Sequence, residues 1–267
     1  MSQVAIIGAG VMGETLLSGL IRAGRRVDDL MVGEKRPERA RELEERYGVT
    51  VVSNVEAAQK ADTVALVVKP QDMDDLLKEI APSIRPGKLV VSLAAGITTS
   101  FLESRLPEGV AVVRVMPNTP ALVDEGMAAI SRGSHCDEAH LVEAETLMAS
   151  TGKVVRVPER QQDAVTAISG SGPAYIFFVV ESMIEAGVHL GLPRATATEL
   201  VVQTLVGSAA MLRETGTHPV VLREQVTSPS GTTASALREL EIHRVRAAFL
   251  AAMEAARNRS RELAEGT

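Results

Sequence analysis

The sequence contains no tryptophan, a single cysteine and few aromatic residues. Of its 267 residues, two are tyrosine, four are phenylalanine and only Cys136 carries a thiol. One cysteine excludes an internal disulfide and a metal site built from several cysteines, and it fits a reducing cytoplasm better than secretion. The hydrophobic residues, 45% of the chain, must therefore build the core mainly from Ala, Val, Leu, Ile and Met.

An excess of positive charge is also missing. The formal net charge is -6 at pH 7, and Lys and Arg are scattered, so neither nucleic acid nor an anionic membrane is an expected partner. The first residues lead into an apolar stretch followed by Glu14, which is not typical of a signal peptide. The apolar run at residues 174–180 ends at Glu181, short of the roughly 20 residues of a membrane span. We therefore expect a soluble, cytoplasmic protein.

The first part of the chain alternates short β-branched runs with amphipathic segments. The runs are VAII, LMV, VTVV, TVALVV, KLVVSL and VAVVRV, with helical patterns such as PERARELEERY and QDMDDLLKEIA between them. This alternation is typical of βαβ units with a mainly parallel sheet. We expect a dinucleotide-binding, Rossmann-type α/β domain over residues 1–158.

The second part, residues 159–267, reads as almost entirely helical, with one long final helix from residue 232. Its helices carry Ala, Val, Leu and Met over wide faces. A helix that is apolar over much of its circumference must be buried on more than one side, and the domain has too few elements to cover these faces itself. We therefore expect an all-helical domain that forms a homodimer.

A glycine-rich loop follows the first predicted strand and opens a helix, which is the context of a dinucleotide fingerprint. Gly8 allows the tight turn, Gly10 lets the backbone approach a pyrophosphate, and Gly13 lets helix and strand pack closely. The helix N-terminus then binds the phosphates through its N–H groups and its dipole. The predicted phosphate-binding residues are Gly8, Ala9, Gly10, Val11, Met12 and Gly13.

The end of the second predicted strand bears on the choice of dinucleotide. Glu34 is suited to accept a hydrogen bond from a ribose 2′-OH, as in NAD sites, whereas Lys35 and Arg36 are suited to a 2′-phosphate, as in NADP sites. Both cations could also be ordinary solvated residues at a helix start. Two adjacent cations favour NADPH as the cofactor, with NADH as the alternative.

The segment VTSPSGTT combines residues that suit an anion. Ser228, Thr232 and Thr233 are cap-type residues, and Gly231 brings backbone N–H groups close to a ligand at the start of a helix. An ordinary capping arrangement explains the same residue types. The residues alone therefore leave a carboxylate site and a structural cap as equal alternatives.

No side chain stands out as a catalytic acid or base, and none of the five histidines lies in a metal-ligand or triad-like pattern. We expect no metal. Lys69 ends the fourth predicted strand, at the edge where ligands bind in open α/β sheets, although an exposed loop lysine is an equal alternative. A dinucleotide enzyme without an acid or base suggests hydride transfer to a carbon that is already electrophilic, as in a protonated imine.

Several stretches together resemble one family. They are AIIGAGVMGETLLSGL, VVKPQDM, VVSLAAGIT, VVRVMPNTPALVDEG, DAVTAISGSGPAYIFFVVESMIEAGVHLGLPR and VTSPSGTTASALRELE. In order and spacing they are similar to pyrroline-5-carboxylate reductase, which makes proline, and the likeness covers essentially the whole chain. The segments SGSGPAY and TSPSGTT are the most specific, because neither is expected in a generic dinucleotide-binding protein.

The resemblance implies hydride transfer from NAD(P)H to 1-pyrroline-5-carboxylate, and a helical domain that interleaves with its partner, with dimers assembling into a larger ring. It also implies that Ser228, Gly231, Thr232 and Thr233 bind the substrate carboxylate, with Thr233 bonding the ring nitrogen as the catalytic residue. Glu159 matches a position that reaches the substrate. The remaining implied cofactor contacts are Asn54 near the adenosine, and Val68, Lys69, Pro70, Ala94, Ala95 and Asn118 on the nicotinamide side.

Two positions depart from the family pattern. Ser230 stands where the family has the first of two glycines, so a positive φ there would strain the loop. His243 and Arg244 stand where the family tends to have a Gly-Gly turn, so we expect the helix to continue through them.

Other functions fit the same fold. One methylene in a pocket discriminates by only about 1–3 kcal/mol, so a related cyclic imino acid, such as the six-membered homologue, is an alternative substrate. A hydroxyacid dehydrogenase would need a catalytic lysine on the first helix of the second domain, and that segment has none. A non-catalytic dinucleotide-binding regulatory protein is the alternative from another class, although the glycine and Ser/Thr motifs are intact.

Overall fold

The computed structural model describes residues 2–265, and the chain divides into two units. One unit comprises the chain up to Ser171 together with the segment from Ala256 onward; the other comprises Gly172–Ala255. The last helix, α12 (Val245–Glu265), therefore begins in the helical unit and ends in the sheet-containing unit. Residues 159–171, which follow the predicted domain boundary, pack with the sheet and belong to the first unit by their contacts.

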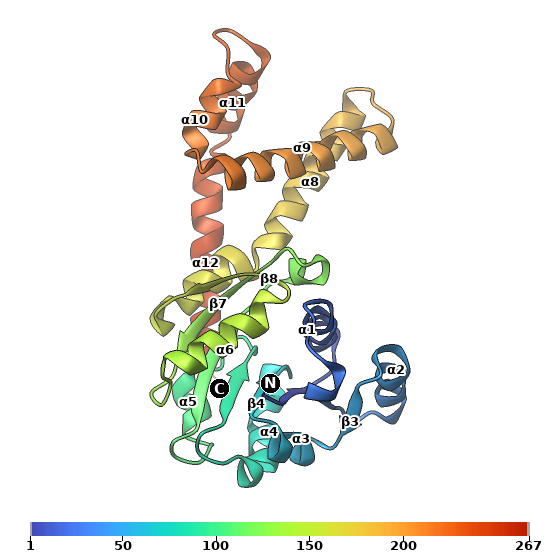
Figure 1. Ribbon diagram of the computed structural model, residues 1–267. Helices are drawn as coiled ribbons and strands as arrows, with labels where there is room; N and C mark the ends of the chain where they lie inside the picture. The colour runs from blue at the N-terminus through green and yellow to red at the C-terminus, as the bar shows by residue number, and fades with distance from the viewer. Residues whose placement is uncertain (1, 266–267) are drawn as a thin grey trace. The chain divides into compact units, whose positions relative to one another are not determined.

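The first unit is built on one eight-stranded sheet (Figure 1) with the order β3-β2-β1-β4-β5-β6-β7-β8. The strands are β1 (Val4–Ile7), β2 (Leu30–Gly33), β3 (Thr50–Val52), β4 (Thr63–Leu66), β5 (Leu89–Ser92), β6 (Ala111–Met116), β7 (Gly126–Arg132) and β8 (Gly152–Arg156). All neighbours are parallel except β6 and β7. The strand order reverses between β1 and β4, and this switch point is where open α/β sheets bind their ligands.

The six predicted strands are confirmed as β1 to β6, and the mainly parallel Rossmann-type sheet is confirmed with them. Strands β7 and β8 were not predicted. The segment GMAAISR of β7 lacks the β-branched run that marks the other strands, and it pairs antiparallel to β6 without a crossover helix. Its place in the sheet is fixed by pairing and burial rather than by local propensity.

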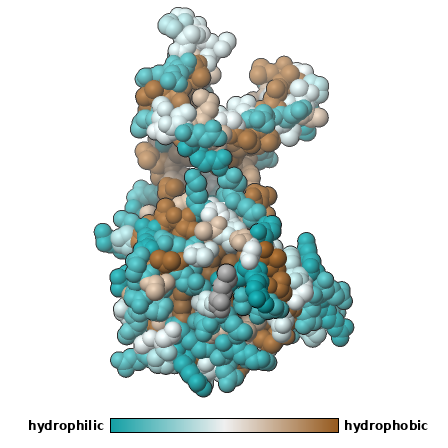
Figure 2. All heavy atoms as spheres, in the orientation of Figure 1, coloured by the Kyte–Doolittle hydropathy of each residue, from teal (hydrophilic) through white to brown (hydrophobic). Residues whose placement is uncertain are grey.

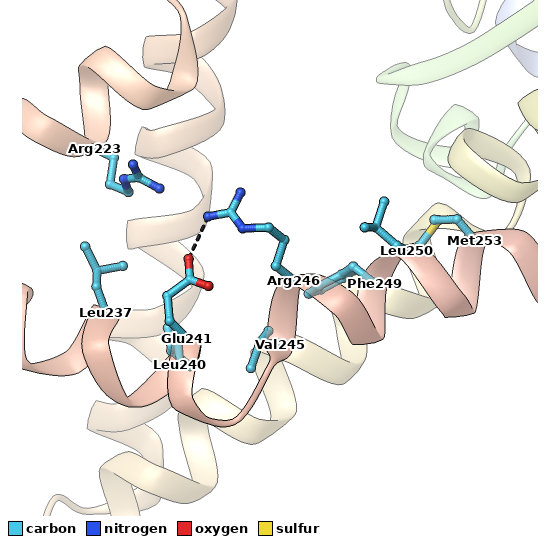
Figure 3. A pocket seen from close by; sticks show the side chains of 9 residues that line it. All are labelled: Arg223, Leu237, Leu240, Glu241, Val245, Arg246, Phe249, Leu250 and Met253. Carbon is cyan, nitrogen blue, oxygen red and sulfur yellow. Dashed lines mark hydrogen bonds and ion pairs between the residues drawn. The ribbon is translucent and has the colours of Figure 1, made fainter.

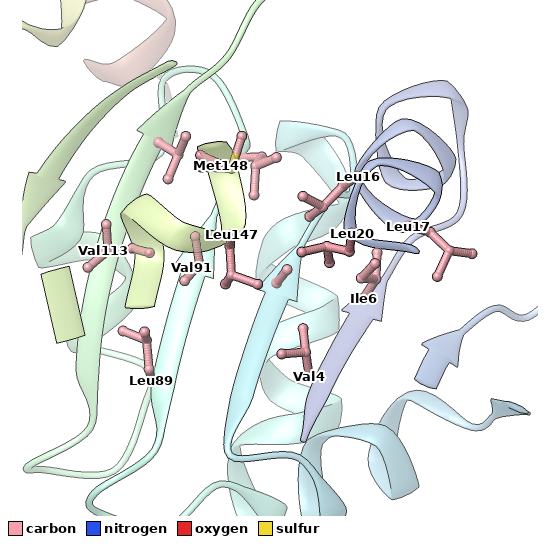
Figure 4. Close-up of a cluster of buried hydrophobic side chains, with 14 of the residues drawn as sticks. Val4, Ile6, Leu16, Leu17, Leu20, Leu89, Val91, Val113, Leu147 and Met148 are labelled. Carbon is pink, nitrogen blue, oxygen red and sulfur yellow. The ribbon is translucent and has the colours of Figure 1, made fainter. Parts of the chain in front are cut away.

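Two buried clusters hold helices on both faces of the sheet. Successive strand residues point to opposite faces, so Val4 and Ile6 of β1 join one cluster, while Ala5 and Ile7 join the other. The first cluster packs α1 (Val11–Arg22) and α6 (Glu138–Ala149) on the sheet, as Figure 4 shows. The second packs α3 (Asn54–Lys60), α4 (Met73–Ile80) and α5 (Thr99–Glu103) on the opposite face. Helix α2 (Pro37–Tyr47) contributes Leu43 to the first cluster.

The second unit consists of helices. A short helix α7 (Gln162–Val165) and one π-helical turn, Thr166–Gly170, lead into α8 (Gly172–His189), which packs on α9 (Arg194–Thr215). Two further helices, α10 (Pro219–Gln225) and α11 (Thr232–Ile242), precede α12. Within residues 172–255, Ala197 alone is buried. Figure 2 shows hydrophobic side chains on the surface of these helices, and the phenylalanines Phe177 and Phe178 are 65% and 69% exposed. The unit does not enclose a core of its own.

The predicted single helix from residue 232 is wrong, because the chain breaks at His243 and Arg244. Arg244 has φ of 54°, in the left-handed region, and its N–H bonds back to the carbonyl of Glu241. Non-glycine residues adopt this conformation uncommonly, and the good helix propensity of arginine hid the break. The chain thus turns at this point without a glycine.

The elbow between α11 and α12 encloses a groove of about 410 Å³ (Figure 3). Its lining is mainly apolar, with an ion pair of 2.7 Å between Arg246 and Glu241 at one side. The apolar lining side chains are Leu237, Leu240, Val245, Phe249, Leu250 and Met253. The groove thus adds to the exposed apolar surface of the helical unit.

Two helical stretches are long and apolar enough to cross a membrane by length and composition. They are Glu159–His189 and Arg194–Thr215, each with a mean hydropathy of 1.3, and 6% and 11% of their apolar windows are buried. The uninterrupted apolar run at 174–180 is only part of the first stretch, because the helix continues through Glu181. Helices of soluble proteins pass the same test, so length and apolarity alone do not assign a membrane.

Candidate functional site

The glycine loop joins β1 to α1 at the switch point of the sheet. Gly8 has φ of 99°, and a Cβ on it would lie 2.6 Å from the Val67 carbonyl oxygen, so no other residue fits there. A Cβ on Gly13 would collide with the Gly8 carbonyl oxygen, which explains the close packing of helix and strand. Gly10 is the N-cap of α1 and has open space around it. The predicted geometry of a phosphate-binding loop is therefore present.

Arg39 of α2, which was not among the predicted site residues, braces this loop. Its Nε donates to the Ala9 carbonyl oxygen at 3.1 Å, and its guanidinium forms an ion pair with Glu14 of α1. Glu14 also accepts from Arg46 and from the Tyr47 hydroxyl, both at 2.8 Å. Burial would raise the pKa of Glu14, but the hydrogen bonds from Arg39 and Tyr47 outweigh it and lower the pKa. Nothing in the helical pattern of α2 distinguishes Arg39 from its neighbouring arginines.

Glu34, Lys35 and Arg36, which are predicted to contact the ribose 2′ position of the cofactor, line a cleft in the first unit. Glu34 lies at the end of β2, and its carboxylate accepts from Arg36 through the backbone N–H at 2.9 Å and through Nε and Nη2 at 3.0 Å. Burial would raise the pKa of Glu34, but these hydrogen bonds lower it. Lys35 forms an ion pair of 2.7 Å with Glu79 of α4. Both predicted cations are thus paired with carboxylates.

Asn54, predicted near the adenosine, is buried and lies in the same cleft. The cleft has a volume of about 440 Å³, and the Asn54 amide nitrogen lies 3.5 Å from Glu79. The lining residues are Ile7, Gly8, Gly33, Glu34, Lys35, Arg36, Asn54, Val68, Asp72, Asp75 and Leu76. The structure therefore brings the glycine turn, the predicted 2′ residues and Asn54 to one cavity.

The residues predicted on the nicotinamide side follow β4, β5 and β6 at the carboxyl edge of the sheet. Val68, Lys69 and Pro70 lead from β4 into a single 3₁₀ turn, with the Lys69 side chain exposed. After β5, Ala94 is buried and Ala95 is exposed. These positions follow β4 and β5, across the switch point from β2, and Val68 also lines the cleft described above.

Asn118, predicted in the same group, already has two partners within the chain. Its amide nitrogen donates to the Ser169 carbonyl oxygen at 3.1 Å, and its amide oxygen accepts from the Met127 N–H at 2.8 Å. Asn118 thus ties the end of β6 to β7 and to the π-helical turn. This is a structural role, and its contact with a cofactor stays a prediction.

The Ser/Thr segment lies between α10 and α11 in the helical unit. Gly231 is the N-cap of α11, and no side chain caps this helix. Ser230 has φ of 58°, so the strained backbone expected at this position is present. Thr233, in the first turn of α11, is half-buried. The capping alternative loses its support, because serine and threonine side chains do not cap the helix.

Glu159, predicted to reach the substrate, uses its carboxylate within the first unit. It accepts from the Thr99 N–H at 2.7 Å and from the Thr99 hydroxyl at 2.6 Å, and it lies 3.4 Å from Arg114 Nη1. The Arg114 side chain is only 5% exposed. Both oxygens of Glu159 are therefore occupied by the α5 terminus and a buried cation.

No cluster of three or more His, Cys, Asp or Glu residues that could hold a metal ion occurs among residues 2–265.

Comparison with known proteins also divides the chain into two parts, although the second match begins at residue 159 and not at 172. Residues 3–96 match the sequence model of the NADP oxidoreductase, coenzyme F420-dependent, family, and residues 159–263 match the model for pyrroline-5-carboxylate reductase dimerisation. The second match contains both of the long apolar helices. The exposed apolar surface of the helical unit is therefore that of a dimerisation domain, and the predicted homodimer is supported.

Relatives with the same architecture cover the whole chain. A pyrroline-5-carboxylate reductase of Corynebacterium melassecola is 46% identical over 98% of this chain and 99% of its own. Solved structures from Coxiella burnetii and Plasmodium falciparum, also pyrroline carboxylate reductases, are 37% and 30% identical, with TM-scores of 0.94 and 0.88, and each match covers 98% of both chains. The Plasmodium structure contains NADP.

The fold and the glycine loop define an oxidoreductase that binds a nicotinamide dinucleotide, and the NADP-type domain agrees with the predicted cofactor. Whole-chain identity of this degree then fixes the family. The chain belongs to the pyrroline-5-carboxylate reductase family, as its motifs predicted.

Proposed function

We propose that the chain reduces the C=N bond of 1-pyrroline-5-carboxylate with a hydride from NAD(P)H and releases L-proline. The observation that carries this proposal is the start of α11. Its N-cap is Gly231, and no side chain caps it. Ser228 precedes this N-cap in the sequence, and Thr232 and Thr233 follow it. An uncapped helix N-terminus flanked by hydroxyl groups suits a carboxylate.

Most of the predicted site residues receive a role in this reaction. The loop from Gly8 to Gly13 binds the pyrophosphate, and Asn54 contributes to the adenosine cleft. Ser228, Gly231 and Thr232 bind the substrate carboxylate, and Thr233 donates to or accepts from the ring nitrogen. The residues on the nicotinamide side are Val68, Lys69, Pro70, Ala94, Ala95 and Asn118. Glu159 is assigned no direct contact with substrate, because its carboxylate is occupied.

This reduction does not require a side chain that acts as a general acid or base. A cyclic imine is electrophilic once its nitrogen is protonated, so the protein has to bind the carboxylate, orient the ring and exclude water. Positioning and fixed dipoles supply most of the rate enhancement in such a reaction. The absence of a histidine pattern in the sequence agrees with this requirement.

The proposal also covers the oligomeric state of the enzyme and its location in the cell. We infer that the homodimers associate further into a ring of dimers, and that the enzyme acts in the cytoplasm. The single cysteine, Cys136, is buried and free, which agrees with a reducing compartment.

The initial rate of reduced-nicotinamide oxidation tests the proposal. The substrate is 1-pyrroline-5-carboxylate, and the six-membered cyclic imino acid is the matched control, with NADPH and NADH assayed separately. We expect a rate with the five-membered ring that exceeds the control. Binding of NADPH without turnover of either imino acid would contradict the proposal and favour a regulatory protein.

A further inference from the structure

The turn after β5 lies where the nicotinamide side of the site is expected. Residues 93–98 connect β5 to α5, and within them Ala95 is exposed while Gly96 has φ of 78°. Ala94 and Ala95 of this turn are assigned to the nicotinamide side in the proposed function. Hydride transfer depends on donor and acceptor being held within a fraction of an ångström, so whatever fixes this turn affects the reaction.

One side of the turn is fixed by Glu159. This residue is 60 positions away in the sequence, yet its two carboxylate oxygens bind the N–H and the hydroxyl of Thr99, the first residue of α5. The same carboxylate is the partner of buried Arg114 on β6. A buried cation needs a compensating anion, so Arg114 holds the carboxylate in place while the carboxylate holds Thr99.

The other side of the turn is bordered by the end of α12. A Cβ on Gly96 would lie 3.7 Å from the Ala264 backbone nitrogen. Four residues earlier, the buried Ser260 hydroxyl donates to Asp163 Oδ1 at 2.8 Å. The segments that precede and follow the helical unit are therefore tied together, and both border the same turn.

We propose that Glu159 is a positioning residue that, through Thr99, sets the turn Ala94–Gly96 against the nicotinamide ring. The proposal rests on the proposed function, which places the nicotinamide at this turn. Glu159 acts through its contacts with Thr99 and Arg114. Its loss should therefore weaken the nicotinamide end of the site and leave the adenosine end, at β2 and α4, unaltered.

The test compares two ligands that differ in the nicotinamide. NADPH carries the ring and 2′-phospho-ADP-ribose lacks it, so the ratio of their dissociation constants measures the contribution of the ring. In Glu159→Gln we expect 2′-phospho-ADP-ribose to bind as in the wild type, while NADPH binds at least about threefold more weakly and kcat falls about tenfold. A role confined to stability would not change this ratio.

A second variant protects the test against loss of folding. Thr99→Val removes the hydroxyl partner but keeps the Glu159–Arg114 pair, and we expect the same change of smaller size, whereas Thr99→Ser should behave as the wild type. Glu145→Gln is the matched control, since Glu145 is paired with Arg156 on the surface at 2.5 Å. It should leave both dissociation constants and kcat unchanged.

The outcomes separate this proposal from the proposed function. An unchanged ratio and unchanged kcat in Glu159→Gln and Thr99→Val would overturn the positioning role, as would parallel weakening of both ligands. Wild-type protein that fails to reduce the imino acid would contradict the proposed function alone, because the ratio of dissociation constants needs no substrate.

Discussion

The two units of this chain solve the problem of burial differently. In the α/β unit, strand residues such as Ile6 and Val90 are completely buried between helices. In the helical unit, Ala197 alone is buried among residues 172–255, and side chains such as Phe178 and Leu250 are exposed. The first unit closes its own core within one chain, whereas the second presents apolar surface that a single chain leaves open.

This difference agrees with the match of residues 159–263 to a dimerisation family. Contiguous apolar surface of this extent marks an interface. In a symmetric dimer the same surface of both subunits is buried at once. The proposed cofactor-binding and substrate-binding segments also lie in different units. The phosphate loop belongs to the self-contained unit, and the proposed carboxylate segment belongs to the unit that needs a partner.

The largest expected effect is loss of the dimer. Phe178→Asp places a charge on the exposed apolar face of α8, where burying a phenylalanine contributes about 1.5–3 kcal/mol on each subunit. We expect the dimer dissociation constant to rise by about 100-fold or more, measured by analytical ultracentrifugation. Val142→Asp, at an exposed apolar position of α6 in the other unit, is the control and should leave the dimer intact. Equal dissociation by both variants would contradict the comparison.

Removing the Thr233 hydroxyl tests whether substrate reduction and cofactor binding depend on different units. Thr233→Ala should lower kcat/KM about tenfold to a thousandfold, the range for a lost transition-state hydrogen bond. NADPH affinity should remain almost unchanged, because the phosphate loop lies in the other unit. Ser235→Ala, at an exposed position of the same helix, should retain activity. An equal loss of cofactor binding in Thr233→Ala would refute the assigned role.

The contribution of Glu14 to the stability of the α/β unit should depend on pH. Its pKa is lowered from the ordinary 4.5, so its ion pairs stabilise the fold above that pH, and the contribution is lost as the pH falls through the folded-state value. Glu14→Gln should lower the free energy of unfolding by about 1–2 kcal/mol at pH 7. The difference from wild type, followed by urea unfolding, should shrink below pH 4.5. A difference that grows in acid would contradict this linkage.

The smallest effect is expected at the 2′ position of the cofactor. The double variant Lys35→Ala with Arg36→Ala should raise KM for NADPH more than KM for NADH, by roughly two- to tenfold, because exposed ion pairs contribute little and either cation can exchange its carboxylate for a phosphate. Steady-state kinetics with both cofactors measures this. If KM changes alike for both, these cations do not bind the 2′-phosphate.

Local patterns predicted most of the sheet. The β-branched runs located β1 to β6, and the spacing of Gly8, Gly10 and Gly13 predicted a loop whose geometry the structure contains. Strand β7 could not be found in this way, because its residues have no strand preference and its place depends on pairing with β6. The family resemblance led us to expect strain at Ser230 if its φ is positive, and the φ is 58°.

Contacts between distant residues were beyond prediction. The bonds of Arg39 to Ala9, and of Glu159 to Thr99, join positions separated by 30 and 60 residues, and no motif marks either pair. The break at Arg244 was missed for the opposite reason, since local helix preference is strong there and the fold overrides it. Both errors arise where tertiary structure outweighs the local pattern.

Hydrogen exchange of the amides tests the comparison between the units most directly. It should be measured by mass spectrometry on wild-type protein and on Phe178→Asp under conditions where the variant is monomeric. We predict that strands β1 to β6 keep their protection in the monomer, while α8 and α9 lose most of theirs. Helices of residues 172–215 that remain as protected in the monomer as in the dimer would contradict the account.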